Sequence, residues 1–149
     1  TLDAARDKAT HALNEGHAAT VFASMVEGLG GPADLLEKPT LYLPQAPIIK
    51  PILAPVSGYV SAMDVRAIGM SMVSLKAGRS KAEDPIDYAV GLSQMVQIND
   101  YVAQGQPIAL AHVRSDDQLT MLNHQLLKNI ELSPKACETQ ALVRECYQA

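Results

Sequence analysis

The densest group of side chains able to do chemistry lies between residues 76 and 87, in the stretch KAGRSKAEDPID. Basic and acidic residues occur together there, which is typical of a solvated surface loop with balanced charge. A second interpretation is a mobile flap that carries Arg79 and Ser80 toward an anionic ligand, with Gly78 allowing the backbone to bend. The stretch lacks the G-x-x-x-x-G-K-S/T spacing of a phosphate-binding loop. The residues by themselves favour the surface loop, and the flap is the functional alternative.

A modified lysine is the second chemistry that the sequence suggests. Residues 53–64, LAPVSGYVSAMD, combine a turn with a short strand, which is how lipoyl- and biotinyl-type carrier domains often begin. Such a carrier needs one exposed lysine at the tip of a tight hairpin. Only Lys76 and Lys81 lie in the relevant interval, neither is next to a methionine, and the interval is too long for a hairpin tip. We therefore expect no carrier lysine.

The other candidate groups have structural explanations. Ser57 has no G-x-S-x-G frame and is predicted to be a turn residue. The side chains of Asp116 and Asp117 would diverge by about 100° on a helix, so they are not expected to form a catalytic pair. Their negative charges would instead stabilise the positive N-terminus of the helix. The methionines are expected to fill the core. The four histidines, none of which has a partner at metal-ligand spacing, are His11, His17, His112 and His124.

The cysteines complete this survey without adding a site. Cys137 and Cys146 have no nearby histidine pair, so they do not form a zinc site, and reduced thiols are expected with a disulfide as the alternative. We therefore predict no catalytic residue, no cofactor and no metal ligand within this chain.

Composition limits the partners and the location. The 149 residues include 12 basic and 16 acidic ones, for a formal net charge of −4, without a basic run, so nucleic acid is not an expected partner. No apolar run is long enough to cross a bilayer and no secretory leader is recognisable, so we expect a cytoplasmic protein without a membrane partner. Because the chain starts on a helical pattern at Thr1, without an initiator methionine, we expect a piece of something longer.

Two helices and a linker are expected in the first 47 residues. Apolar spacing predicts a helix over 1–16 and another over 17–31, the latter ended by Gly30, Gly31 and Pro32. Residues 33–47 contain three of the nine prolines and are predicted to form a short helical turn followed by an extended linker. The second helix has an apolar stripe that should pack on a larger body, formed by Ala18, Val21, Phe22, Met25 and Leu29.

The remaining chain mixes strands and helices, which predicts an α+β fold. Strands are expected at 48–55, with Pro51 restricting this strand to an edge or bulge position, and at 58–63, 86–95 and 108–113. A last extended piece, 140–146, follows Pro134.

Two capped helices are expected between these strands. Asp64 should cap the first, in which Gly69 is expected to contact the sheet closely, and Ser115 should cap the second, with Gln118 completing a capping box. The predicted buried stripes are Val65, Ile68, Met72 and Leu75 in the first helix, and Leu119, Leu122, Leu126 and Ile130 in the second.

Three motifs together resemble the pyrimidine-nucleoside phosphorylase family, and within it the enzymes that act on thymidine. GYVSAMDVRAIGM, AGRSKAEDPIDY and VAQGQPI occur in that order, and VFASMVEGLGGPADLLEK with YLPQAP extends the resemblance over essentially the whole chain. The resemblance implies attack of phosphate on C1′ of a pyrimidine deoxynucleoside, which releases the base and 2-deoxyribose 1-phosphate. It also implies a homodimer whose helical and α/β domains bind phosphate and nucleoside in the cleft between them.

The resemblance implies a division of this chain as well. Residues 1–36 would be a helical segment of the large domain, 37–47 a linker, and 48–149 a C-terminal α/β-hammerhead, or half-barrel, module. No stretch matches the family's catalytic motif, so this part would be structural and cleft-forming, inactive without the remainder of the phosphorylase polypeptide. The family's loop near the cleft corresponds to residues 76–84, which makes the flap as well supported as the surface loop. The alternatives are a stand-alone half-barrel that docks a partner through the 18–29 stripe, and the carrier.

Overall fold

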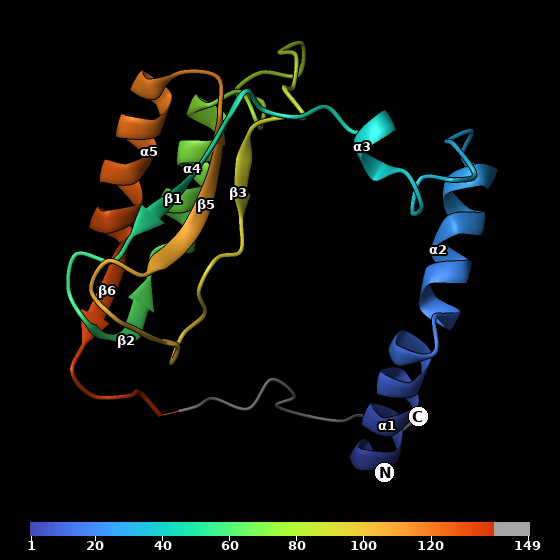
Figure 1. The fold of residues 1–149 in the computed structure, drawn as a ribbon, viewed down its shortest axis with the longest axis horizontal. Coiled ribbons are helices and arrows are strands. Elements are labelled where there is room, and N and C mark those ends of the chain that lie inside the picture. The colour runs from blue at the N-terminus through green and yellow to red at the C-terminus, as the bar shows by residue number, and fades with distance from the viewer. Residues whose placement is uncertain (139–149) are drawn as a thin grey trace. The chain divides into compact units, whose positions relative to one another are not determined.

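The computed structural model describes residues 1–138 and divides the chain into two compact units, Thr1–Pro44 and Gln45–Ala149 (Figure 1). The first unit is helical, and the second contains two antiparallel sheets and two helices. The predicted α+β class is therefore confirmed. The extended piece predicted at 140–146, and Cys146 within it, lie outside the described residues.

The first unit begins with the two predicted helices. Helix α1 spans Leu2–Asn14 and is capped by Thr1, whose hydroxyl accepts a hydrogen bond from the backbone N of Ala4 at 3.3 Å. Helix α2 spans His17–Gly28. The chain turns between them at Gly16, whose φ of 77° lies in the left-handed region that glycine adopts without a steric penalty.

A short helix, α3 (Pro39–Tyr42), lies in the segment predicted to be a linker. It is joined to the preceding turn by Asp34, which accepts hydrogen bonds from the hydroxyl of Tyr42 at 2.6 Å and from Nζ of Lys38 at 2.9 Å. These two hydrogen bonds lower the pKa of Asp34, and the bond to Asp34 raises the pKa of Tyr42. Hydrogen bonds from Lys38 and Tyr42 to Asp34 therefore give the segment 33–47 local structure.

The first unit has no core of its own, because none of its residues is buried. The apolar stripe predicted on α2 is present but uncovered: Val21 is 69% exposed and Leu29 is 83% exposed. The other large apolar side chains exposed in this unit are Leu2, Leu13, Phe22, Met25, Leu36, Leu41, Tyr42 and Leu43.

The second unit contains two three-stranded antiparallel sheets. In the first sheet the strand order is β1 (Ile48–Leu53), β5 (Pro107–Val113), β3 (Gly91–Ser93). In the second the order is β4 (Tyr101–Val102), β2 (Gly58–Met63), β6 (Ile130–Ser133). Pro51 lies in β1 at the edge of its sheet, as predicted, where its missing N–H costs no ladder hydrogen bond.

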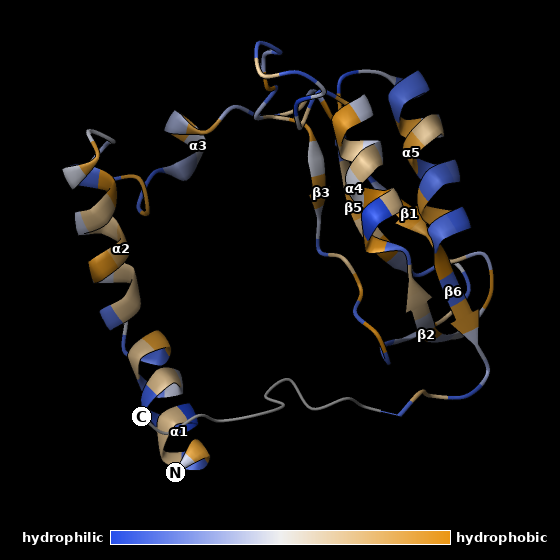
Figure 2. Cartoon of the chain, turned by 180° about the vertical axis from the view of Figure 1, so that it is seen from behind, coloured by the Kyte–Doolittle hydropathy of each residue, from blue (hydrophilic) through white to orange (hydrophobic). Residues whose placement is uncertain are grey.

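Helices α4 (Val65–Ser74) and α5 (Asp116–Asn129) lie beside these strands, as Figure 1 shows. Helix α5 packs against α4 and against β1, β5 and β6. In Figure 2 blue and tan bands alternate along α5, which is the pattern of a helix with one polar and one apolar face. The largest fully buried side chains of the unit are Ile52, Val60, Leu75, Ile108, Val113, Leu122 and Leu126.

Both predicted helix caps are confirmed. A carboxylate oxygen of Asp64 accepts from the backbone N of Ala67 at 2.8 Å, and the hydroxyl of Ser115 accepts from the N of Gln118 at 3.3 Å. The side chain of Gln118 reaches one residue further back than in a standard capping box, because its oxygen accepts from the backbone N of Arg114 at 2.8 Å.

The structure corrects two predictions about α4. Val65 does not belong to the buried stripe, since it is 72% exposed, and Ser71 is buried together with Ile68 instead. Gly69 makes no close contact with the sheet: it is exposed, and a Cβ added there would have no atom within 4 Å. The first turn of α4 extends beyond the core, so the apolar spacing predicts one buried residue, Val65, that the structure leaves exposed.

Two further corrections concern strands. The strand predicted over 86–95 is shorter in the structure, where only β3 (Gly91–Ser93) is extended and paired. Before it the chain turns, because the carboxylate of Asp87 accepts a hydrogen bond from the backbone N of Ala89 at 3.1 Å. Strand β6 was not predicted. Its first residue, Ile130, was assigned to the helical stripe because it follows Leu126 by four positions, but it is extended and pairs with Met63 of β2.

Candidate functional site

The 76–87 loop starts from the C-terminus of α4, which ends in a Schellman motif. The backbone N of Lys76 donates to the carbonyl of Val73 at 2.9 Å, and the N of Ala77 donates to the carbonyl of Met72 at 3.0 Å. The motif requires a left-handed residue after the helix, and Lys76 fills this position with φ of 68°. For a residue other than glycine, this conformation costs about 1–2 kcal/mol. The chain therefore turns sharply at Lys76, and not at Gly78 as the sequence suggested.

The loop is closed at its base. The backbone N of Asp87 donates to the carbonyl of Lys76 at 2.8 Å, so the residues between them leave the body of the unit and return to the same point. The tip is joined internally: Oδ2 of Asp84 accepts from the backbone N of Ser80 at 3.0 Å and of Lys81 at 2.9 Å. A loop tied in this way has its own local structure.

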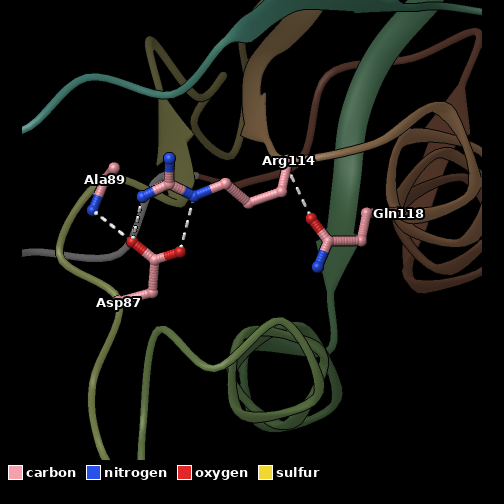
Figure 3. Close-up of polar contacts among 4 residues, drawn as sticks. All are labelled: Asp87, Ala89, Arg114 and Gln118. Atoms are coloured by element: carbon pink, nitrogen blue, oxygen red, sulfur yellow. Dashed lines mark hydrogen bonds and ion pairs between the residues drawn. The ribbon is translucent and has the colours of Figure 1, made fainter.

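An ion pair connects the base of the loop to the junction between β5 and α5 (Figure 3). Nε and Nη2 of Arg114 donate to the two carboxylate oxygens of Asp87, each at 2.8 Å. This two-pronged arrangement is the strongest geometry that an arginine and a carboxylate adopt. On the opposite side, the backbone of Arg114 is held by Gln118. The backbone of Arg114 and the carboxylate of Asp87 are therefore each held by a hydrogen bond outside the ion pair.

The contacts of Asp87 change its protonation. The hydrogen bonds from Arg114 are the main cause that lowers the pKa of Asp87 to about 2, and the bond from the N of Ala89 adds to the effect. The same pairing raises the pKa of Arg114. Both groups are consequently charged at neutral pH. They form hydrogen bonds with each other, which leaves neither of them available to bind a substrate.

Of the three residues proposed as a flap, Arg79 and Ser80 lie at the exposed end of this loop and Gly78 is partly buried. Arg79 and Ser80 are exposed, and within residues 1–138 neither Arg79 nor Lys81 has an ion-pair partner. Gly78 is close to α4, since an added Cβ would lie 3.2 Å from Cγ2 of Val73. The site that sequence reasoning missed is the anchor, because Asp87 and Arg114 are 27 positions apart and no motif joins them.

Ser57 has the structural role predicted for it. Its hydroxyl accepts from the backbone N of Gln104 at 2.8 Å, which joins two turns of the second unit. One Ser–His contact was not predicted: Nε2 of His112 in β5 lies 2.7 Å from Oγ of Ser93 in β3. No motif in the sequence signals this contact, and among residues 1–138 no carboxylate forms a hydrogen bond with His112 that would orient it as the base of a nucleophile.

A groove of about 510 Å³ lies between α4 and α5 of the second unit, and Asp64, Ser71 and Ser74 are among its lining residues. Asp64 is used as a helix cap, and both serine hydroxyls donate to backbone carbonyls of α4. Within residues 1–138 no group of three or more His, Cys, Asp or Glu side chains could hold a metal ion. No helix in this part of the chain is long and apolar enough to span a membrane.

The comparison with known families decides what kind of module this is. Residues 59–133, half of the chain, match the family model of the pyrimidine nucleoside phosphorylase C-terminal domain. The chain belongs to this family. The matched range runs from β2 to the end of β6, so it includes α4, the 76–87 loop, the Asp87–Arg114 pair and α5. The family resemblance inferred from the three motifs is confirmed.

Two curated relatives extend the match. Thymidine phosphorylases from Burkholderia cenocepacia (strain HI2424) and from Burkholderia orbicola (strain AU 1054) are each 47% identical to this chain over 112 residues. The aligned region is 75% of this chain but only 26% of each relative. The chain therefore spans about a quarter of the length of the curated relatives that it matches.

Proposed function

We propose that this chain is the C-terminal part of a thymidine phosphorylase, a pentosyltransferase of pyrimidine nucleoside salvage in the cytoplasm. The observation that supports it is the 47% identity to two thymidine phosphorylases together with the family match over residues 59–133. In the proposed reaction, an oxygen of phosphate forms a bond to C1′ of thymidine while the bond from C1′ to the base breaks. Thymine leaves with the electron pair and takes up a proton, and 2-deoxyribose 1-phosphate is the second product.

The role of this part is structural and cleft-forming, and the chain is inactive alone. The polar side chains of the described residues support this role, because Asp64, Ser57 and Asp87 serve a helix cap, a turn and an ion pair, respectively. Phosphate and nucleoside would be bound chiefly by the remaining three quarters of the polypeptide. A closing cleft would hold the phosphate against the sugar carbon and exclude water.

The first unit is the part that joins this module to the rest of the enzyme. We propose that residues 1–36 belong to the large domain, that 37–47 form the linker, and that 48–149 form the terminal half-barrel module. The exposed stripe on α2 supports this division, because helices with no buried residue need a partner surface to be stable. The complete enzyme is proposed to be a homodimer.

The flap of Gly78, Arg79 and Ser80 is proposed to help order the closed cleft without taking part in the chemistry. Arg79 would contribute a guanidinium, which matches the geometry of phosphate oxygens. Its exposure and its lack of an ion-pair partner within residues 1–138 are consistent with that role.

The test compares the 149-residue chain with the full gene product that contains it. Each is incubated with thymidine and phosphate, and thymine release is measured, with uridine as a second substrate and phosphate omitted as the control. We expect phosphate-dependent thymine release from the full gene product only. Substantial turnover by the 149-residue chain would overturn the structural role, and an inactive, folded full gene product would overturn the enzyme assignment.

A further inference from the structure

The attachment of the 76–87 loop to the second unit is concentrated at one place. Lys76 and Asp87 meet through a backbone hydrogen bond of 2.8 Å, and Asp87 also carries the ion pair to Arg114. Arg114 follows β5 directly and precedes the Ser115 cap of α5, so it is joined to a strand and a helix that contribute buried core residues. The orientation of the loop base is therefore set by the Asp87 carboxylate and the Arg114 guanidinium.

The far end of the loop is held separately. The Asp84 carboxylate binds the backbone N–H groups of Ser80 and Lys81, which leaves the side chains of Arg79 and Lys81 exposed and without a carboxylate partner among the described residues. Because the tip is held by its own hydrogen bonds and the base by Asp87, the position of the tip depends on the base. A change at Asp87 would therefore displace the tip, together with the cations that it carries, and expose it more often.

We propose that Asp87 and Arg114 are a positioning pair that orients Arg79 and Ser80 of the 76–87 loop toward a bound inorganic phosphate or the phosphate of the sugar product. This proposal rests on the proposed phosphorylase function. Arginine is suited to the anchor because its planar fork fixes the carboxylate in angle as well as distance, whereas a lysine would fix only a distance. The pair acts through the loop and makes no contact with substrate.

The first test needs no enzymatic activity. Trypsin can cut the 149-residue chain after Arg79 and Lys81, and the cleavage rate reports how often the loop opens. We expect Asp87→Asn to raise cleavage at these two sites by about fivefold or more. Arg114→Lys, which keeps the charge but loses the fork, should give a smaller increase in the same direction. Asp116→Asn is the matched control, because it breaks the nearby Lys50–Asp116 ion pair of 3.1 Å and should leave loop cleavage within about twofold.

The second test uses the full gene product. If the pair positions the loop for phosphate, Asp87→Asn should raise the KM for phosphate by about fivefold or more, and should leave kcat and the KM for thymidine within about twofold. Circular dichroism and the unfolding midpoint verify that each variant folds. A variant that merely loosens the fold would change all three kinetic constants together.

Each outcome decides between distinct ideas. Unchanged loop cleavage in Asp87→Asn, or an equal change in Asp116→Asn, would overturn the anchoring role. Faster cleavage with an unchanged KM for phosphate would overturn the positioning role. If Asp87→Asn does not fold, Arg114→Lys decides on the same two measurements. A wild-type full gene product without thymidine phosphorolysis would overturn the proposed function, whereas the trypsin result would still decide whether the pair anchors the loop.

Discussion

Arg114 and Asp87 face each other through two parallel hydrogen bonds of 2.8 Å, although 27 positions separate them in the sequence. The contact joins the start of α5 to a loop that follows α4. Gln118 accepts from the backbone N of Arg114, and the backbone N of Ala89 donates to the Asp87 carboxylate, so the arginine backbone and the aspartate side chain are each held by a hydrogen bond outside the ion pair. Such preorganisation reduces the entropy lost when an exposed ion pair forms.

The first prediction concerns acid stability. The folded-state pKa of Asp87, about 2, lies below the ordinary aspartate value of 3.8, so the folded state favours the ionised carboxylate. The resulting stabilisation is fully present above about pH 4 and is lost as the pH falls toward about 2. We expect urea unfolding midpoints of the wild type to fall more steeply than those of Asp87→Asn between these pH values. Parallel pH profiles for the two proteins would contradict this reading of the pair.

Local signals in the sequence predicted the elements that position the site. Asp64 and Ser115 were recognisable as helix caps from their residue types and the apolar periodicity that follows them. Pro51 indicated an edge strand because a proline has no N–H for a second neighbour. These inferences succeed because each depends on the chemistry of the residue itself or on contacts within a few residues along the chain.

The features that could not be predicted depend on contacts between distant residues. Nothing in the sequence near Asp87 indicates Arg114, and nothing near Ile130 indicates that a strand begins directly after a helix, with no glycine or proline between them. The spacing from Leu126 to Ile130 fits one helical turn, and only the pairing of Ile130 with Met63 removes it from the helix. The sequence therefore predicts a loop at residues 76–87 but does not predict the Asp87–Arg114 ion pair that holds its base.

A second prediction compares two glycines. Gly69→Ala should stabilise the chain by about 0.5–1 kcal/mol, because Gly69 lies in a helix interior and an added Cβ meets no atom within 4 Å. Gly58→Ala should destabilise it by about 1–3 kcal/mol, because its Cβ would lie 2.9 Å from the backbone oxygen of Ser133 in the neighbouring strand. Chemical unfolding measures both. Destabilisation by Gly69→Ala in the 149-residue chain would show that this face of α4 is covered after all.

A third prediction tests the core under the site. Leu122 of α5 is fully buried, so Leu122→Ala should lower the free energy of unfolding by about 2–5 kcal/mol through lost contacts and a residual cavity. Val65→Ala is the control, since Val65 is 72% exposed and its truncation should change stability by no more than about 0.5 kcal/mol. A loss of about 2 kcal/mol or more for Val65→Ala as well would mean that Val65 belongs to the buried face of α4.

The last prediction addresses the uncovered stripe on α2. Val21→Lys and Leu29→Lys should change the unfolding of the 149-residue chain by no more than about 0.5 kcal/mol, because these side chains are 69% and 83% exposed. In the full gene product the same lysines would be placed against the apolar surface that α2 is proposed to contact. They should lower its stability by about 2 kcal/mol or more, since burying an unpaired charge is costly.

Glu27→Lys is the matched control for this experiment, because Glu27 lies on the opposite side of α2, about 180° around the helix from the centre of the stripe. It places a lysine on α2 outside the proposed contact, and its charge change of +2, against +1 for Val21→Lys and Leu29→Lys, makes it the stricter test of a charge effect alone. The unfolding midpoint of the full gene product should therefore fall for Val21→Lys and Leu29→Lys and stay near the wild-type value for Glu27→Lys. Equal midpoints for all three variants would mean that α2 is exposed in the full gene product too, and that the first unit does not join the module to the large domain through this stripe.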